Sequence, residues 1–323
     1  MSNNIQFNEL QKAILETVAF FDIFEYPLTL VEVYKWLYLT GSQKDKYKLI
    51  NIIQALGGSD LQGYIETKNG FYFLRGRPKI IRTRLDRYQI AEGKFKIALK
   101  TIKQLQHLAF IKMIAVCNTV GYNNATPVSD IDFFIIVKNG RLWWSRLVIT
   151  LITSLFGIRR HDQKIADRVC LSFYISDNHL NLSDIALKPD DIYLNYWLVT
   201  LAPVYGNSVY QDFLAANSWL VNQLPNFYAA GMTNRRFVSD NNLAKGLKKI
   251  DEFLLGDFIG GFFEYLAKAM ELKKMKKRIA ADGLVANTNV IVNDTMLKFH
   301  ENDRRAEYQS LWRKALANFG FNR

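Results

Sequence analysis

Apolar side chains recur at helical spacing along the first part of the chain, and this pattern predicts a compact helical module. The first stripe consists of Leu10, Ile14, Val18 and Phe21. Pro27 interrupts the helical pattern, and Thr29 is a suitable N-cap for a second helix. A third helix is expected over about residues 46–56, because two glycines follow it directly.

Two short β-rich runs follow the helices, over residues 63–67 and 71–74. Asn69 and Gly70 lie between them, and an Asn-Gly pair in this position is a strong hairpin signal. Three helices and a hairpin resemble a winged helix-turn-helix domain, which we assign to residues 1–85. Such modules read DNA in some proteins and serve as packing or substrate-clamping domains in others, and both roles stay open at this point.

The most informative pattern lies in the next segment, residues 86–188. A long basic helix is expected over residues 86–108, and the continuous apolar run 111–117 predicts a buried strand. A turn-rich stretch then leads to a second apolar strand that begins at Asp130-Ile131-Asp132. Because side chains alternate along a strand, Asp130 and Asp132 point to the same face.

This Asp-x-Asp pair is a candidate metal site. Two neighbouring carboxylates raise each other's pKa unless a cation neutralises them. Mg²⁺ prefers hard oxygen ligands and commonly accompanies bound phosphates. Asp130 and Asp132 are therefore candidate Mg²⁺ ligands, although an isolated Asp-x-Asp pair also occurs as a cap or a turn.

The spacing around the pair resembles that of the nucleotidyltransferase superfamily with the polymerase-β-like fold. The family pattern is an apolar strand, Gly-Ser at a helix start, about ten residues, and then Ser-Asp-x-Asp on the next strand. Here Asn118-Thr119 takes the Gly-Ser position, ten residues separate Thr119 from Asp130, and Ser129 precedes the acid pair. The resemblance implies that Asn118, Thr119 and Ser129 bind a nucleoside triphosphate, while Asp130 and Asp132 hold two Mg²⁺ ions.

The chain departs from the family pattern at two places. Asn118 replaces a glycine, whose missing side chain lets phosphate approach the backbone closely. Active members also carry a third carboxylate on a later strand, which is expected here over residues 168–175. That strand offers Cys170, Ser172 and Tyr174, which are expected to share one face, and Ser172 is the expected substitute for the acid. Either Asp162 or Asp167 from the preceding loop replaces the acid, or the domain binds nucleotide without efficient chemistry.

The formal net charge is +12, from 42 basic and 30 acidic side chains, and the surplus is unevenly distributed. Residues 68–112 hold twelve basic and only two acidic side chains, and a second basic run covers residues 273–278. Dense positive charge attracts phosphate backbones, so nucleic acid is a candidate partner through residues 68–112. A solvated helix face is the alternative. Smaller candidates for phosphate contacts are Arg159, Arg160, Lys298, His300, Arg304 and Arg305.

The remaining segment, residues 189–323, has mainly helical periodicity, with a short strand-like run at Val290-Ile291-Val292. The expected fold class is therefore α+β: a winged-helix-like module, a small mixed-sheet nucleotidyltransferase-like core and a helical C-terminal region. Two cysteines exclude a disulfide framework and suit a reducing compartment. We see neither a signal peptide nor an apolar run long enough for a membrane span, which favours a cytoplasmic protein that does not contact membranes.

Together these patterns favour Mg²⁺-dependent transfer of a nucleotide monophosphate from a nucleoside triphosphate to an acceptor hydroxyl, with weakened catalysis. The alternative is a nucleic-acid-binding regulatory protein with a degenerate, nucleotide-binding transferase domain. The sequence indicates neither the acceptor, the preferred nucleotide nor the oligomeric state.

Overall fold

The computed structural model describes residues 6–39, 47–161, 164–227, 234–240, 242–282, 290–299 and 303–321. It combines helices with a three-stranded and a six-stranded sheet, and the larger sheet is mixed, so the expectation of a mixed helix-and-sheet protein is confirmed. Over the described ranges, no helix is both long enough and apolar enough to cross a membrane.

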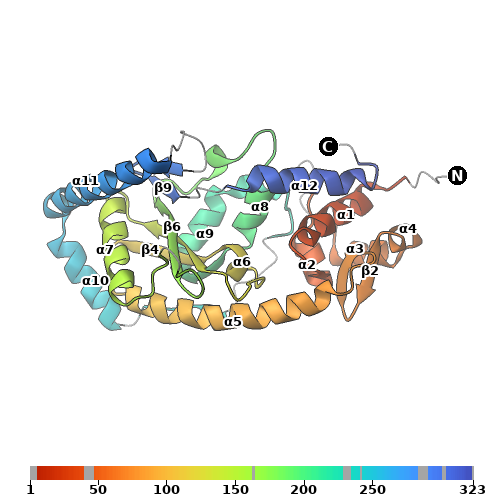
Figure 1. The fold of residues 1–323 in the computed structure, drawn as a ribbon, viewed down its shortest axis with the longest axis horizontal. Helices are drawn as coiled ribbons and strands as arrows, with labels where there is room; N and C mark the ends of the chain where they lie inside the picture. Colours follow the sequence, from red (N-terminus) through yellow and green to blue (C-terminus); the bar gives the residue numbers. More distant parts are fainter. Residues whose placement is uncertain are drawn as a thin grey trace.

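The N-terminal module occupies one end of the molecule (Figure 1). In chain order it contains α1 (Glu9–Asp22), β1 (Leu28–Thr29), α2 (Leu30–Lys35), α3 (Leu49–Gly57), α4 (Ser59–Gln62), β2 (Ile65–Lys68) and β3 (Phe71–Leu74). Strands pair antiparallel in the order β1-β3-β2. The expected hairpin is present, and Asn69 and Gly70 have positive φ angles of 54° and 79°, which two-residue hairpin turns require. Thr29 caps α2 as expected, and Glu32 completes the capping box.

The central sheet has the strand order β7-β4-β5-β6-β9-β8. Its strands are β4 (Ile111–Val116), β5 (Ile131–Val137), β6 (Val169–Ser176), β7 (Ala202–Tyr205), β8 (Val290–Val292) and β9 (Met296–Phe299). β5 and β6 run parallel, and the other neighbours run antiparallel. The three apolar runs expected as strands are β4, β5 and β6, whereas β7 and β9 come from the segment expected to be helical.

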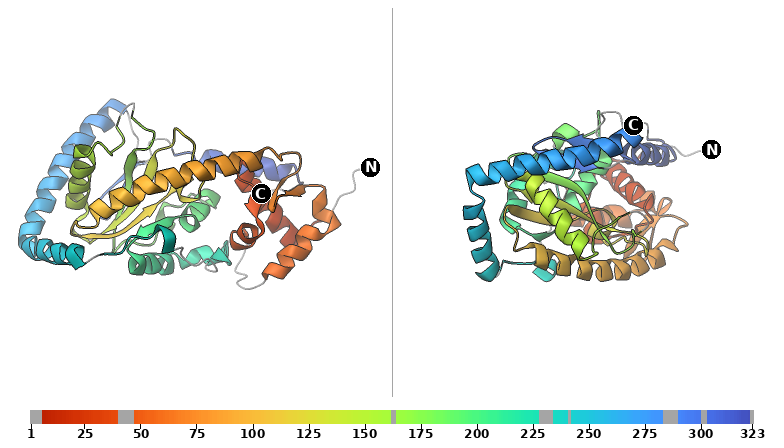
Figure 2. Two further views of the ribbon diagram at one scale, coloured as in Figure 1. Left: turned by 90° about the horizontal axis from the view of Figure 1, so that it is seen from below. Right: turned by 60° about the vertical axis from the view of Figure 1, so that its left-hand side comes forward.

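Helices cover both faces of the central sheet (Figures 1 and 2). One face packs against α5 (Ile80–Leu105), α7 (Leu142–Leu155) and α11 (Asp257–Asp282). The other face packs against α8 (Ile192–Val199) and α9 (Asn207–Ala216), and its hydrophobic core continues into α1 and α2. The remaining elements are α6 (Asn118–Gly121), α10 (Asn242–Leu254), α12 (Arg305–Ala317) and the 3-10 helices η1 (Ser183–Ile185), η2 (Ser218–Asn222) and η4 (Asn234–Arg236).

Two helices connect the N-terminal module to the sheet. α5 runs along one side of the molecule, and α12 returns along the other to pack against α1 and α8 (Figure 1). The indole Nε1 of Trp312 in α12 donates a 2.9 Å hydrogen bond to the carbonyl of Glu16 in α1. Because α5 begins at Ile80, the expected domain boundary after residue 85 falls within this single helix.

Candidate metal and nucleotide site

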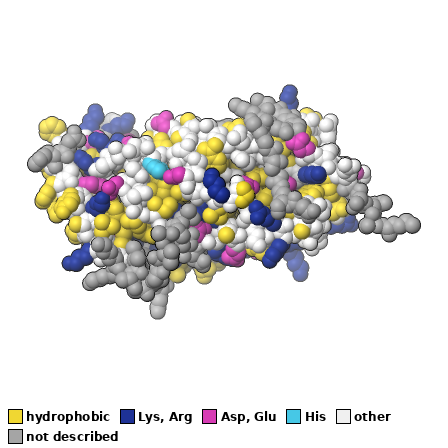
Figure 3. Space-filling model, turned by 90° about the horizontal axis from the view of Figure 1, so that it is seen from above, with side chains coloured by type: hydrophobic (Ala, Val, Ile, Leu, Met, Phe, Trp, Pro, Cys, Tyr) yellow, Lys and Arg dark blue, Asp and Glu magenta, His cyan; other side chains and the backbone are white. Residues whose placement is uncertain are grey.

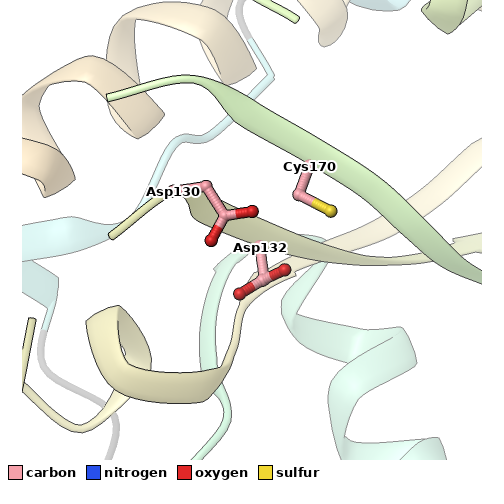
Figure 4. A group of neighbouring side chains, drawn as sticks. All are labelled: Asp130, Asp132 and Cys170. Carbon is pink, nitrogen blue, oxygen red and sulfur yellow. The ribbon is translucent and has the colours of Figure 1, made fainter. Parts of the chain in front are cut away.

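Asp130, Asp132 and Cys170 converge at the end of the central sheet where the inner strands β5 and β6 begin (Figure 4). Asp130 directly precedes β5, Asp132 is its second residue, and Cys170 of β6 is the pairing partner of Asp132. One potential ligand atom from each side chain lies within 4.8 Å of the other two. Two carboxylate oxygens and one thiol sulfur therefore face the same small volume.

Asn118 fixes the position of Asp132. Asn118 is the first residue of α6, shortly after β4 ends, and has a φ of 54°, a left-handed conformation that asparagine tolerates better than most residues with a side chain. Its Oδ1 accepts a 2.9 Å hydrogen bond from the indole Nε1 of Trp197 in α8. The amide nitrogen of Asn118 is thus directed to Asp132, with which it forms a hydrogen bond. Asn118 therefore orients a candidate metal ligand.

The two other residues expected to bind nucleotide are less directly placed. Thr119 follows Asn118 in α6 and is partly buried. The hydroxyl of Ser129 lies 3.0 Å from both the backbone nitrogen and the hydroxyl oxygen of Thr126, so it closes a local turn. The ammonium group of Lys94 binds the carbonyl of Ser129 at 2.8 Å and holds this turn in place. The structure thus brings Asn118, Asp130 and Asp132 together, and the Ser129 hydroxyl is directed to Thr126.

The expected position of the third acid needs correction. A β-bulge in β6 sets four residues of β6, Cys170 to Phe173, opposite three residues of β5, Asp132 to Phe134. The bulge breaks the alternation, so Tyr174 packs into the core beneath α5 and α7, away from Cys170. The residue that pairs with Asp132, before the bulge, is Cys170 and not Ser172.

In the part of the chain that the structure describes, no third carboxylate joins the acid pair. The carboxylate of Asp167 instead accepts a 2.6 Å hydrogen bond from Lys94. Asp162, the other loop acid considered from the sequence, lies outside the described residues.

Burial and mutual repulsion perturb the ionisation of the site. Desolvation, followed by the charge of Asp130, raises the pKa of Asp132 to about 6, although Asn118, Cys170 and Arg160 favour the charged form. Burial and the two carboxylates raise the pKa of the Cys170 thiol well above its usual range. Without a further cation, Asp132 therefore takes up a proton more readily than an ordinary aspartate, and Cys170 stays a neutral thiol.

The nearest positive charge is Arg160, in the loop between α7 and β6. Its Nη1 lies 2.7 Å from Oδ2 of Asp130 and 4.0 Å from the Cys170 sulfur. The Arg160 side chain is 45% exposed, whereas that of Asp130 is 16% exposed. A half-exposed arginine thus reaches inward to a largely buried carboxylate.

Asp132, Asn118, Cys170 and Arg160 line a cleft of about 950 Å³. The described residues around it include seven arginines and lysines but only three carboxylates: Arg146, Arg159, Arg160, Lys274, Lys298, Arg304, Arg305, Asp132, Glu271 and Asp303. Aromatic side chains, Trp197, Tyr193 and Tyr308 among them, form part of its wall, and the two tyrosine rings stack with centroids 5.2 Å apart. The cleft combines a positive lining with flat aromatic surfaces.

Several of the candidate phosphate-binding cations hold the fold together. Arg305, with a side chain only 6% exposed, binds Asp191 and Asp303 at 2.8 Å each. Lys298 is buried and lies 3.1 Å from Asp303. Arg305 and Lys298 therefore form structural ion pairs at the wall of the cleft. His300, another of these candidates, lies outside the described residues.

The basic segment 68–112 is partly neutralised by acids from elsewhere in the chain. Arg84 forms a two-pronged ion pair with Glu32 at 2.7 and 2.8 Å, and Arg87 binds Glu25. Lys96, Lys100 and Lys103 lie exposed along α5. Figure 3 shows the face of the molecule opposite α5, on which basic side chains are dispersed with acidic ones between them. The charge count of this segment therefore overstates the positive surface that it forms.

No family model, curated protein or solved structure matches this chain. The geometry adds residues that sequence reasoning did not assign to the site, above all Trp197 and Tyr308. Both come from helices more than sixty residues after Asp132, and no local pattern marks them as part of the site. Arg160 was a minor candidate from its charge alone, and its contact with Asp130 gives it a defined place.

Proposed function

We propose that this chain is a nucleotidyltransferase-like enzyme that transfers a nucleotide monophosphate from a nucleoside triphosphate to an acceptor hydroxyl, with Mg²⁺ as cofactor. The observation that carries the proposal is the convergence of Asp130 with Asp132, which itself lines a basic cleft with aromatic side chains in its wall. The parallel β5-β6 pair, with the acids at the start of β5, supports a nucleotidyltransferase-like core. The β1-β3-β2 sheet together with helices α1, α2 and α3 supports a winged-helix-like N-terminal module.

The donor set fits Mg²⁺. This ion is commonly held by one or two carboxylates together with substrate phosphates and water, and Asp130 and Asp132 supply those carboxylates. Bound Mg²⁺ would supply charge stabilisation at the attacking and leaving oxygens of the phosphoryl centre. The neutral thiol of Cys170 stands beside the carboxylates and adds no negative charge.

The chain's own residues divide the remaining work. Asn118 holds Asp132 in one orientation, because Trp197 fixes the direction of its amide group. Arg160 and Lys274 line the cleft and provide positive charge for the phosphate chain. With Cys170 opposite Asp132, no described carboxylate is positioned to accept the proton of the acceptor hydroxyl. We therefore infer slow turnover together with substantial nucleotide binding.

The test is calorimetric titration with each nucleoside triphosphate, with and without Mg²⁺. Wild type should bind at least one triphosphate in an Mg²⁺-dependent manner. The variant with Asp130→Asn and Asp132→Asn should lose that dependence while keeping its far-ultraviolet circular dichroism spectrum. The matched control is Asp86→Asn with Asp212→Asn, which removes the same charge from exposed or partly exposed helix positions. Equal Mg²⁺ dependence in both double variants would refute the proposed site.

A second candidate function is a cytoplasmic nucleic-acid-binding regulatory protein whose transferase domain only senses nucleotide. The thiol in place of a third acid favours it, as do the exposed lysines Lys96, Lys100 and Lys103. In contrast, α3, which would be the reading helix of a winged helix, has no basic residue and exposes Ile50 and Ile53. Nucleic acid would therefore contact α5 rather than α3.

Salt dependence distinguishes this candidate from the enzyme. If α5 binds a duplex, changing Lys96, Lys100 and Lys103 to Gln should reduce the slope of log affinity against log salt by about 0.9 for each phosphate that the variant no longer neutralises. The same change at the exposed Lys245, Lys249 and Lys273, on other helices, should leave the slope in place. An identical slope in both triple variants would exclude α5 as the nucleic-acid surface.

A further inference from the structure

The ion pair between Arg160 and Asp130 differs from the other arginine pairs around the cleft. Arg305 is nearly buried and has two acidic partners. Arg146 is buried between Glu271 and the ring of Phe299. Arg160 is half exposed, and among the described residues Asp130 is its one acidic partner. Of these three cations, Arg160 is the one able to leave its partner without unpacking a core.

The backbone that carries Arg160 is firmly held. The Arg160 amide donates a 2.9 Å hydrogen bond to the carbonyl of Val169, and the Val169 amide donates one to Ile158. The neighbouring Arg159 forms an isolated parallel bridge with Val169, so this segment of the loop is attached to the start of β6. Rotation of the Arg160 side chain therefore requires no movement of the loop.

The charge balance of the site shows when Arg160 is needed. With no other cation present, Asp130 and Asp132 together carry up to two negative charges, and Arg160 compensates one of them. A divalent cation compensates both carboxylates by itself. Arg160 would then be a surplus positive charge beside the cation, and the anion that best accommodates it is the phosphate chain of a nucleotide in the same cleft.

We propose that Arg160 is an exchangeable counter-cation, bound to Asp130 in the empty site and transferred to the phosphate chain when a metal-bound nucleoside triphosphate enters. This inference rests on the proposed function and specifies how its two ligands are coupled. Arg160 and the divalent cation compete for Asp130, so the cation binds weakly to the nucleotide-free protein. Nucleotide removes the competitor, and each ligand therefore raises the affinity for the other by the same factor.

The experiment uses Mn²⁺ as a spectroscopic probe for the divalent cation and a non-hydrolysable α,β-methylene nucleoside triphosphate. Free Mn²⁺ is measured by electron paramagnetic resonance, with and without the analogue, for wild type, Arg160→Gln and Arg160→Lys. Arg304→Gln is the matched control. It removes the same charge from the same cleft, but its partner is Glu307, which lies outside the acid pair.

Arg160→Gln should bind Mn²⁺ roughly fivefold more tightly than wild type in the absence of nucleotide, which is the order of effect expected for a partly exposed ion pair. The same variant should bind the analogue more weakly, and the mutual enhancement between Mn²⁺ and analogue should decrease. Arg160→Lys, which keeps the charge, should remain close to wild type. Arg304→Gln should slightly raise Mn²⁺ affinity at most.

Two results would overturn the proposal in distinguishable ways. Nucleotide-free Mn²⁺ affinity in Arg160→Gln that equals or falls below that of wild type would refute the exchange while leaving the metal site in place. Absence of Mn²⁺ binding in every variant, with and without the analogue, would refute the proposed function and the exchange together. Thermal melting of each variant confirms that the compared proteins are folded.

Discussion

Two regions of this molecule bring opposite charges together, and they do so to different degrees. At the junction between α5 and the N-terminal module, Arg84 meets Glu32 through two hydrogen bonds and stacks over the ring of Tyr26 at 4.1 Å. At the end of the central sheet where β5 and β6 begin, Asp130 lies beside Asp132, and among the described residues Arg160 is the one cation paired with Asp130. The junction is a completed ion pair, whereas the acid pair Asp130 and Asp132 retains a negative charge that the described side chains around it do not neutralise.

This difference teaches that pairing, more than charge density, separates a structural contact from a candidate ligand site. Arg84 belongs to the most basic segment of the sequence, yet it is already bound to acid from α2. The acid pair Asp130 and Asp132 has few charges around it. Burial and the charge of Asp130 nevertheless raise the pKa of Asp132, because Arg160 offsets only part of their effect. This contrast is tested by experiments that change the charge beside Asp132 or remove the ion pair between Arg84 and Glu32.

The largest effect is expected from adding a third carboxylate beside Asp130 and Asp132. Cys170→Asp would place a carboxylate opposite Asp132, where it can serve as a general base. Because such a base typically contributes about 10²- to 10⁴-fold, pyrophosphate release should rise by at least the lower factor. Ser172→Asp is the comparison: it introduces the same acid two residues further along β6 in the same cleft and should raise pyrophosphate release less, because Asp132 pairs with Cys170 and not with Ser172. Rapid pyrophosphate release by the wild type would contradict a weakened site.

A smaller effect is expected from breaking the junction. The side chains of Arg84 and Glu32 are 12% and 18% exposed, so removal of one leaves a largely buried, unpaired charge. Arg84→Ala should therefore lower the free energy of unfolding by about 3 kcal/mol, measured by urea denaturation. Arg82→Ala, two residues earlier on α5, removes an exposed pair with Asp86 and should change it by less than about 0.5 kcal/mol. Equal losses in the two variants would remove the proposed distinction between the regions.

The smallest effect is the pH dependence of the incomplete site. The pKa of Asp132 is raised to about 6, so protons compete with a divalent cation below that pH. Mn²⁺ affinity of the nucleotide-free protein should be nearly constant above pH 7 and should fall by up to about tenfold per pH unit below pH 6. Titrations between pH 5 and 8 measure this directly. A flat profile through pH 6 would show that Asp132 is not a ligand.

Local signals in the sequence predicted much of the fold. The Asn69-Gly70 turn, the Thr29 cap and the apolar runs of β4, β5 and β6 depend on neighbouring residues, and the structure has each of them. β7 and β9 were missed, because four residues each are too few to show a strand periodicity before a pairing partner is known.

The candidate site was predictable to the same extent. Asp130 and Asp132 are two residues apart, so strand periodicity alone places them on one face. Cys170 could not be chosen over Ser172, because the register between two parallel strands that are connected through α7 leaves no mark in the sequence of β6. The pairing of Arg84 with Glu32, 52 positions away, likewise depends on how α5 crosses the N-terminal module.

The late origin of β7 and β9 has a consequence for how the protein is made. A fragment covering residues 86–188 would contain β4, β5 and β6 but neither outer neighbour, so both β4 and β6 would present open edges. Open apolar edges recruit other strands, and such a fragment should aggregate. During synthesis the outer edge of β6 likewise stays unpaired for more than a hundred residues until β9 emerges, so we expect the nascent chain to depend on chaperones over this interval.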